Sequence, residues 1–102
     1  MRVEIRARSF ALTRALQAHV ERRLGLTLGR FGSRISRVVV RLGHLNGPRG
    51  VDKRCQIAVN VVRTRSVVVD DRDADLHAAI DRAADRAGRY VSRLLACDRE
   101  LS

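Results

Sequence analysis

Residues 76–94 read LHAAIDRAADRAGRYVSRL, and this segment has the clearest periodicity in the chain. Its apolar residues recur every three or four positions, which is the spacing of an amphipathic α-helix that buries one face. They are Leu76, Ile80, Ala83, Ala87, Val91 and Leu94. Because this stripe is unbroken, the sequence predicts one long helix packed against another layer of the protein.

The segments before this helix have the periods of strands and of one more helix. Residues 2–8, 37–42 and 55–61 alternate between apolar and polar side chains, which is the pattern of half-buried strands. Residues 67–69 form a further short apolar strand. From Thr13, the expected N-cap, the apolar residues follow helical spacing instead. These residues are Leu16, Val20, Leu24, Leu28 and Phe31.

The predicted element order is β-α-β-β-β-α, an α+β fold in one domain of residues 1–102. Each strand has an apolar and a polar face, so we expect a four-stranded sheet with two helices packed on one face and water on the other. Residues 43–50, GHLNGPRG, have loop composition, and residues 63–65 must turn the chain without a Gly or Asn. The acids of residues 70–75, DDRDAD, are expected at the N-terminus of the last helix, where capping and the helix dipole favour them.

The chain has 102 residues, 45% of them hydrophobic, with a formal net charge of +10. This composition excludes a disordered basic tail. No apolar run approaches the roughly 20 residues of a membrane span, and Arg2, Arg6 and Arg8 interrupt the stretch where a signal peptide has its apolar core. Cys55 and Cys97 lie far apart in the sequence, which favours a reduced, cytoplasmic protein. No membrane partner is expected, because the amphipathic helices need their apolar faces for the core and no spare Trp or Phe is left to insert.

Basic residues dominate the first half of the chain. Residues 1–50 carry eleven basic and two acidic residues, 11 − 2 = +9, whereas residues 51–102 carry ten and nine, 10 − 9 = +1. Such an excess predicts a polyanionic partner. The chain has only two Phe, one Tyr and no Trp, too few for a platform that stacks the bases of a single strand.

Both predicted helices carry arginines away from their apolar stripes. Four arginines of the last helix fall within a sector of about 60° and are expected to form one exposed ridge. They are Arg82, Arg86, Arg89 and Arg93. The first helix adds Arg22, Arg23 and Arg30. We expect these side chains to bind RNA phosphates and to release counterions. The simpler alternative is a solvated helix face on which Asp85 pairs with Arg89.

The remaining polar residues predict neither a metal site nor a catalytic site. The acids of residues 70–75 lack the glycine-centred pattern of a calcium loop. His19, His44 and His77 lie on three different elements without the spacing of zinc ligands. No nucleophile with a nearby base and no phosphate-binding loop is recognisable. The sequence therefore predicts a protein that is not an enzyme and uses no cofactor, metal or small-molecule substrate.

The opening of the last helix is also similar to a known motif. Residues 75–81, DLHAAID, resemble an Asp-x-Tyr-x-Ala-Ile-Asp opening, with basic positions after it at Arg86 and Arg89. On these residues the chain resembles the family of ribosome hibernation promoting factors and ribosome-associated inhibitors, also called sigma-54 modulation proteins. The likeness extends to residues 5–16 and to residues 53–57, KRCQI.

Three features depart from the family pattern. His77 stands where Tyr is common, and Tyr90 stands where Gln is common. The chain also ends at Ser102 without the extra domain by which long members pair two ribosomes. It therefore resembles a short form.

The resemblance implies a β-α-β-β-β-α fold similar to that of double-stranded RNA-binding domains. It also implies a translation inhibitor of stressed or stationary-phase cells, bound to the small ribosomal subunit in the channel of messenger and transfer RNA. Family members contact ribosomal RNA through basic residues on both helices. The matching positions here are Arg23, Arg82, Arg86, Arg89 and Arg93, whereas Arg22 and Arg30 are included for their helix faces alone.

Two other functions remain open at this point. A general double-stranded RNA-binding module would need similar basic elements, because it reads the shape of an A-form helix. A protein-interaction module that acts on a transcription or signalling partner would use the charge for solubility.

Overall fold

Four β-strands, two α-helices and one 3-10 helix follow one another in the computed structural model, which describes residues 1–8, 10–47, 50–63 and 65–101. The elements are β1 (Arg2–Ala7), α1 (Arg14–Leu28), the 3-10 helix η1 (Gly29–Arg34), β2 (Ile35–Gly47), β3 (Gly50–Val61), β4 (Ser66–Asp73) and α2 (Leu76–Leu101). The order of the strands and α-helices is the one predicted from the sequence.

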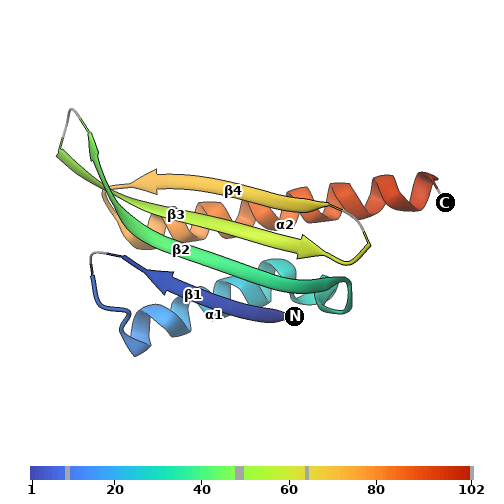
Figure 1. The fold of residues 1–102 in the computed structure, drawn as a ribbon, viewed down its shortest axis with the longest axis horizontal. Coiled ribbons are helices and arrows are strands. Elements are labelled where there is room, and N and C mark those ends of the chain that lie inside the picture. Colours follow the sequence, from blue (N-terminus) through green and yellow to red (C-terminus); the bar gives the residue numbers. More distant parts are fainter. Residues whose placement is uncertain (9, 48–49, 64, 102) are drawn as a thin grey trace.

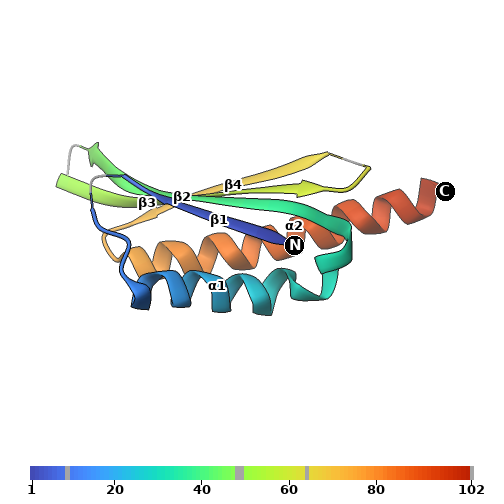
Figure 2. The same cartoon turned by 60° about the horizontal axis from the view of Figure 1, so that its bottom comes forward.

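The strands form one sheet in the order β1-β2-β3-β4. β1 pairs with β2 in parallel, whereas the β2–β3 and β3–β4 pairs are antiparallel. Both α-helices cover one face of the sheet, and the opposite face is open (Figure 1, Figure 2). The predicted α+β architecture is therefore confirmed, and the molecule presents a helix surface on one side and a strand surface on the other.

The hydrophobic core lies between the sheet and the helices. On β3 the alternate residues from Cys55 to Val61 are buried, as their alternation predicts. On α2 the apolar stripe is buried from Leu76 to Val91, and it ends on Leu95 rather than on Leu94, which is only partly buried. No polar or charged side chain of the described residues is fully buried. The charges therefore all lie on the surface of a rigid apolar layer.

α1 begins as the sequence predicts. The side chain of Thr13 accepts a hydrogen bond from the backbone N–H of Leu16 at 3.1 Å, so it caps a helix N-terminus that would otherwise leave this donor unpaired. The α-helix ends at Leu28 instead of continuing to Phe31, because residues 29–34 (GRFGSR) tighten into η1. Two glycines in these six residues weaken the α-helical preference.

The predicted loop over residues 43–50 is wrong for most of its length. Residues 43–47 continue β2, and the pairing with β3 extends to the last described pair, Gly47 with Gly50. Residues 48 and 49 lie outside the described residues. The ladder continues here because its hydrogen bonds come from the backbone, which Gly, His and Asn supply as well as other residues do.

The acidic segment before α2 is also placed differently from the prediction. Residues 70–73 belong to β4 and pair with residues 53–56 of β3, so only Asp75 stands at the helix N-terminus. Its Oδ1 accepts from the backbone N–H of His77 at 3.0 Å. The turn before β4 uses Arg63 at a φ of 62°, a left-handed conformation that Gly or Asn usually supplies. Strand β4 thus brings the carboxylates of Asp71 and Asp73 alongside α2.

Two features bear on membrane insertion and on thiol chemistry. Among the described residues, no helix combines the length and the apolar character needed to cross a bilayer. Both cysteines are free thiols; Cys55 is buried on β3 and Cys97 is exposed on α2.

Candidate nucleic-acid interface

α1 and α2 lie side by side (Figure 2), and a glycine occupies the point where they are very close. A Cβ atom on Gly88 would come within 2.8 Å of the carbonyl oxygen of Thr27. Thr27 turns its own hydroxyl back to donate to the carbonyl oxygen of Arg23 at 3.0 Å. Because Gly88 has no side chain, the backbones of the two helices can pack closely here, with the Cβ of Thr27 also at the contact, and a groove lies on the outer surface.

This groove has a volume of about 590 Å³ and joins α2 to the end of α1 and the start of η1. Three of the predicted site residues line it, and they are Arg30, Arg89 and Arg93. The lining is completed by Leu26, Thr27, Asp85, Gly88 and Ser92. We call this feature the helix groove. It brings together three arginines against one carboxylate, from segments more than fifty residues apart in sequence.

The one carboxylate of the helix groove is already paired with another residue. Asp85 Oδ1 lies 2.8 Å from Nη2 of Arg23, and Asp81 Oδ1 lies 3.3 Å from Nε of the same guanidinium. The predicted pair of Asp85 with Arg89 is therefore not formed among the described residues, because Asp85 points across to α1. The side chain of Arg23 is only 26% exposed, and it joins the two helices. Among the described residues Arg89 has no ion pair.

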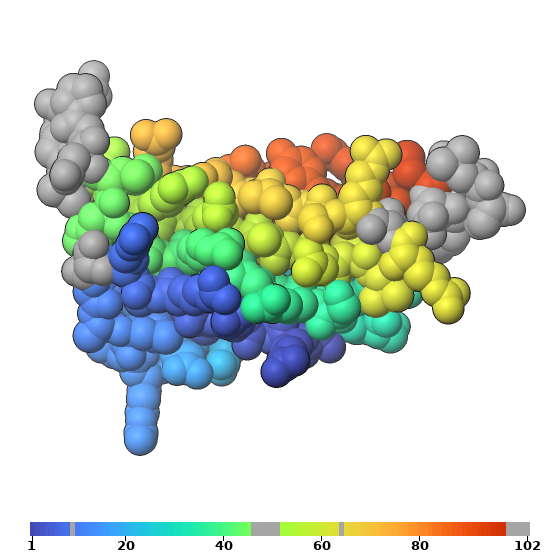
Figure 3. All heavy atoms as spheres, in the orientation of Figure 1, coloured from blue at the N-terminus to red at the C-terminus, as the bar shows by residue number. Residues whose placement is uncertain are grey.

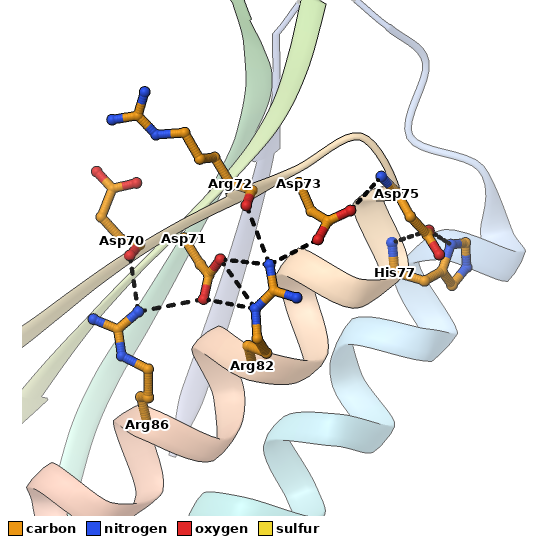
Figure 4. A network of polar contacts seen from close by, with 8 residues as sticks. All are labelled: Asp70, Asp71, Arg72, Asp73, Asp75, His77, Arg82 and Arg86. Atoms are coloured by element: carbon orange, nitrogen blue, oxygen red, sulfur yellow. Dashed lines mark hydrogen bonds and ion pairs between the residues drawn. The ribbon is translucent and has the colours of Figure 1, made fainter.

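Two arginines of the predicted ridge turn toward the sheet (Figure 4). Arg82 Nη2 lies 2.9 Å from Asp71 Oδ1 and 2.9 Å from Asp73 Oδ2. Arg86 Nη1 lies 3.3 Å from Asp71 Oδ2 and donates to the carbonyl oxygen of Asp70 at 3.1 Å. These contacts hold α2 against β4.

The charges in this network neutralise one another. Hydrogen bonds from Arg82 lower the pKa of Asp71, whose side chain is only 11% exposed. The pKa of Asp73 is lowered by the backbone N–H of Asp75 and then by Arg82. The same contacts raise the pKa of Arg82. Arg82 therefore stays charged, but its charge is matched by that of the carboxylates beside it.

The course of β4 explains why the predicted single ridge is divided. β4 and α2 run in opposite directions (Figure 1), so the acidic end of β4 lies beside the first turns of α2. Arg82 and Arg86 form ion pairs with carboxylates there. The other end of β4, residues 66–69 (SVVV), carries no acid. Arg89 and Arg93, further along α2, consequently remain exposed without ion pairs among the described residues.

Aromatic rings support two of the groove arginines. The guanidinium of Arg30 lies 4.6 Å from the centre of the Phe31 ring, and that of Arg93 lies 5.9 Å from the ring of Tyr90. Such contacts orient a cation without neutralising it, which leaves its N–H groups available to a phosphate.

Arg22 lies apart from the helix groove, in a second hollow of about 560 Å³ near the start of α2. Here the structure brings together His19 and His77, which sequence reasoning left separate because they are 58 positions apart. Their ring centres are 4.6 Å apart, and Nε2 of His19 lies 2.8 Å from Asp81 Oδ1. No group of three metal-binding side chains is found in the part of the chain that the structure describes.

The fold and the helix groove define an α+β protein whose helix surface suits a polyanion. A model of the family described as sigma 54 modulation protein / S30EA ribosomal protein matches residues 3–96. The chain therefore belongs to this family, as the motif at the start of α2 indicates, and the family is one of ribosome-associated proteins. No curated protein sequence matches the chain.

The solved structures that are similar to this chain include the following two. The N-terminal domain of Protein Y from Thermus thermophilus is 30% identical and has a TM-score of 0.71, over 91% of this chain and 98% of that one. A ribosomal subunit interface protein from Coxiella burnetii is 15% identical and has a TM-score of 0.77, over 94% and 99% of the two chains. The second likeness concerns the fold alone.

Proposed function

We propose that this protein binds the small ribosomal subunit through ribosomal RNA, in the channel that messenger and transfer RNA would occupy, and thereby inhibits translation in stressed cells. The observation that carries the proposal is the helix groove, where Arg30, Arg89 and Arg93 converge on one hollow. Membership of a ribosome-associated family supports the nature of the partner.

The electrostatics of the groove favour a phosphate backbone. The charge of Asp85 is already matched by Arg23, so a ligand meets three arginines that no other carboxylate among the described lining residues opposes. Guanidinium groups bind phosphate oxygens with two parallel hydrogen bonds. Each phosphate neutralised also releases counterions from the RNA, which makes binding favourable and sensitive to salt.

The other predicted RNA-binding residues have different roles in this proposal. Arg22 is exposed on the outer side of α1 and extends the contact beyond the helix groove. The helices and β4 are held in place by Arg23, Arg82 and Arg86. These side chains can contact RNA only through N–H groups that do not face a carboxylate. Loss of these three should therefore weaken the fold as well as binding.

The proposal is tested by sedimentation of the purified protein with small ribosomal subunits at low salt. We expect the wild type to co-sediment, and we expect Arg30→Glu, Arg89→Glu and Arg93→Glu each to weaken binding by roughly tenfold or more. Arg14→Glu is the matched control, because it changes the charge equally at an exposed position at the start of α1. A wild type that stays at the top of the gradient would refute the proposal.

Competition distinguishes this function from the two alternatives. A free RNA duplex that displaces the protein from small subunits at equal mass would identify a general double-stranded RNA-binding module. Capture of a partner protein that survives nuclease treatment would identify a protein-interaction module. The proposed function requires that neither result is obtained and that small subunits are bound in preference to duplex.

A further inference from the structure

The face of the sheet that no helix covers is turned toward the viewer in Figure 3, and arginines lie on it. On β2 the residues that alternate with buried Val40 and Leu42 point to this face, and they include Arg41 and Gly43. The strand register places Arg6 beside Arg41, and it places Arg54 beside Gly43. The predicted wet face therefore carries arginines from three neighbouring strands.

These arginines surround a hollow of about 480 Å³. Its charged or polar lining consists of Arg6, Arg8, Arg41, His44, Arg54 and Gln56. Gly43 also lines it, and since this residue has no side chain the surface is lower there than at its neighbours. No carboxylate lines this hollow, which we call the sheet hollow. It holds one more arginine than the helix groove does.

The arginines of the sheet hollow are only partly neutralised from outside it. Glu4 accepts from Arg6 at 2.9 Å and also pairs with Arg37, which leaves it shared between two cations. Asp70 accepts from Nε of Arg54 at 2.9 Å. Among the described residues, Arg8 and Arg41 have no ion pair. Five arginines thus face two carboxylates, 5 − 2 = +3, on this part of the face.

The geometry of the hollow matches a phosphate backbone better than a compact ligand. Arg6 and Arg8 are two positions apart on one chain segment, so their Cα atoms are separated by about 7 Å. Arg41 lies beside Arg6 on β2, and Arg54 lies one strand further on, on β3. Cations at such intervals can meet successive phosphates, whereas a compact ligand would reach only some of them. The aromatic residues near it, Phe10 and His44, contact each other with ring centres 5.1 Å apart.

We propose that the sheet hollow binds the phosphate backbone of a second RNA segment, so that the domain joins two RNA segments held against its opposite faces. The inference takes the nature of the partner from the proposed function, and it adds a separate site. The two α-helices and the open face of the sheet lie on opposite sides of the molecule (Figure 2), and the helix groove and the sheet hollow belong to these two separate surfaces. A straight RNA segment on one face therefore cannot reach the other.

The test is a titration of isotope-labelled protein with an RNA duplex of about 12 base pairs, which is shorter than the roughly 16 base pairs that a double-stranded RNA-binding domain spans. Backbone N–H signals are followed by NMR. In the wild type we expect two groups of signals to shift, one near the helix groove at Arg89 and Arg93 and one near the sheet hollow at Arg8 and Gly43.

Charge-reversed variants assign each group of shifts to its surface. The double variant Arg8→Glu with Arg41→Glu should weaken binding at the sheet hollow roughly tenfold or more and leave the helix-groove shifts unchanged. The matched control, Arg14→Glu with Arg65→Glu, makes the same charge change at two exposed positions outside both hollows and should leave both groups unchanged.

Two results would overturn the inference. One is a wild type whose signals at the sheet hollow do not shift with RNA, and the other is a shift that Arg8→Glu with Arg41→Glu leaves unchanged. A shift produced by poly-glutamate and not by RNA would assign the hollow to a protein partner and would also overturn it. If only the helix-groove signals fail to shift, the result contradicts the RNA surface of the proposed function. The inference about the sheet hollow is then unaffected.

Folding of the variants is checked in the same spectra. Core signals such as those of Val20 and Val59 must keep their positions. Where the double Glu variant disturbs them, Arg8→Gln with Arg41→Gln removes the two charges without adding new ones, and it must also weaken binding at the sheet hollow if the inference holds.

Discussion

Arg82 of α2 donates to the carboxylate of Asp71 in β4, with Nη2 and Oδ1 2.9 Å apart, so an arginine on the solvent side of the helix joins it to the edge strand of the sheet. Asp71 is the better buried partner, with 11% of its side chain exposed, against 50% for Arg82. The pair therefore stabilises the fold. Its contribution to the free energy of unfolding should be measured by substitution of Asp71, the less exposed partner.

Asp71→Asn is expected to lower the free energy of unfolding. The variant replaces the carboxylate that accepts from Arg82 and Arg86 with a neutral amide. Because solvent screens the two arginines, the free energy of unfolding should fall by about 1 kcal/mol. Urea unfolding at neutral pH measures it. Glu21→Gln, which makes the same charge change at an exposed residue of α1 bonded only to Gln17, should have almost no effect. Equal effects of the two substitutions would contradict a structural role for Asp71.

The same pair predicts a loss of stability in acid. Hydrogen bonds from Arg82 lower the pKa of Asp71 in the folded state. A lowered folded pKa means that the contribution is complete above the unfolded value of about 3.9 and is lost as the pH falls through the folded value. The difference in unfolding free energy between wild type and Asp71→Asn should therefore shrink from pH 5 to pH 2, by about 1 kcal/mol. A difference that stays constant over this range would exclude the assigned cause.

The close contact between α1 and α2 predicts opposite effects for two glycines. A Cβ on Gly88 would lie 2.8 Å from a backbone oxygen of Thr27, whereas one on Gly25 would meet nothing within 4 Å. Gly88→Ala should destabilise the protein by about 1–3 kcal/mol because the helices must separate. Gly25→Ala should stabilise it by up to about 1 kcal/mol through helix propensity.

Thermal unfolding of the two variants beside the wild type gives the comparison. Because the helix groove lies over the contact, Gly88→Ala should also weaken binding to small subunits, whereas Gly25→Ala should not. A Gly88→Ala variant as stable as Gly25→Ala would mean that the helices are not in the close contact described.

The two thiols should differ in reactivity. Burial raises the pKa of Cys55 to about 12, so its reactive thiolate is scarce and inaccessible, whereas Cys97 is exposed on α2. A thiol reagent should modify one cysteine of the native protein, at Cys97, and reach Cys55 only after unfolding. Mass spectrometry of the modified peptides makes the assignment. Modification of Cys55 at the same rate as Cys97 would contradict its place in the core.

The sequence predicts the elements whose side chains have strong periodicity. The alternation from Cys55 to Val61 and the stripe from Leu76 to Val91 identify buried faces because burial of apolar area sets the pattern. The ends of β2 and β4 are missed because pairing there depends on backbone partners on β3, which composition does not record. Residues 70–73 form a strand because their backbone pairs with residues 53–56 of β3, a partner that their own composition does not show.

The sequence predicts which residues belong to the candidate site, but it does not predict how they are arranged in space. The position of each residue around the helix axis correctly places the four arginines of α2 away from the core. It carries no information on β4, whose acids pair with Arg82 and Arg86. The pairing of Arg23 with Asp85 depends in the same way on the closeness of α1. The sheet hollow is visible only once Arg6, Arg41 and Arg54, from three strands, are placed in register.

Salt titration of binding to purified small ribosomal subunits tests the central claim most directly. The wild type should show a logarithmic slope that corresponds to several phosphate contacts, and the triple variant Arg30→Glu, Arg89→Glu and Arg93→Glu should lose about 0.7–0.9 of slope for each contact removed. The triple variant should also bind weakly at every salt concentration. A wild type that does not bind small subunits at low salt, or a slope that the triple variant leaves unchanged, would contradict the claim that the helix groove docks on ribosomal RNA.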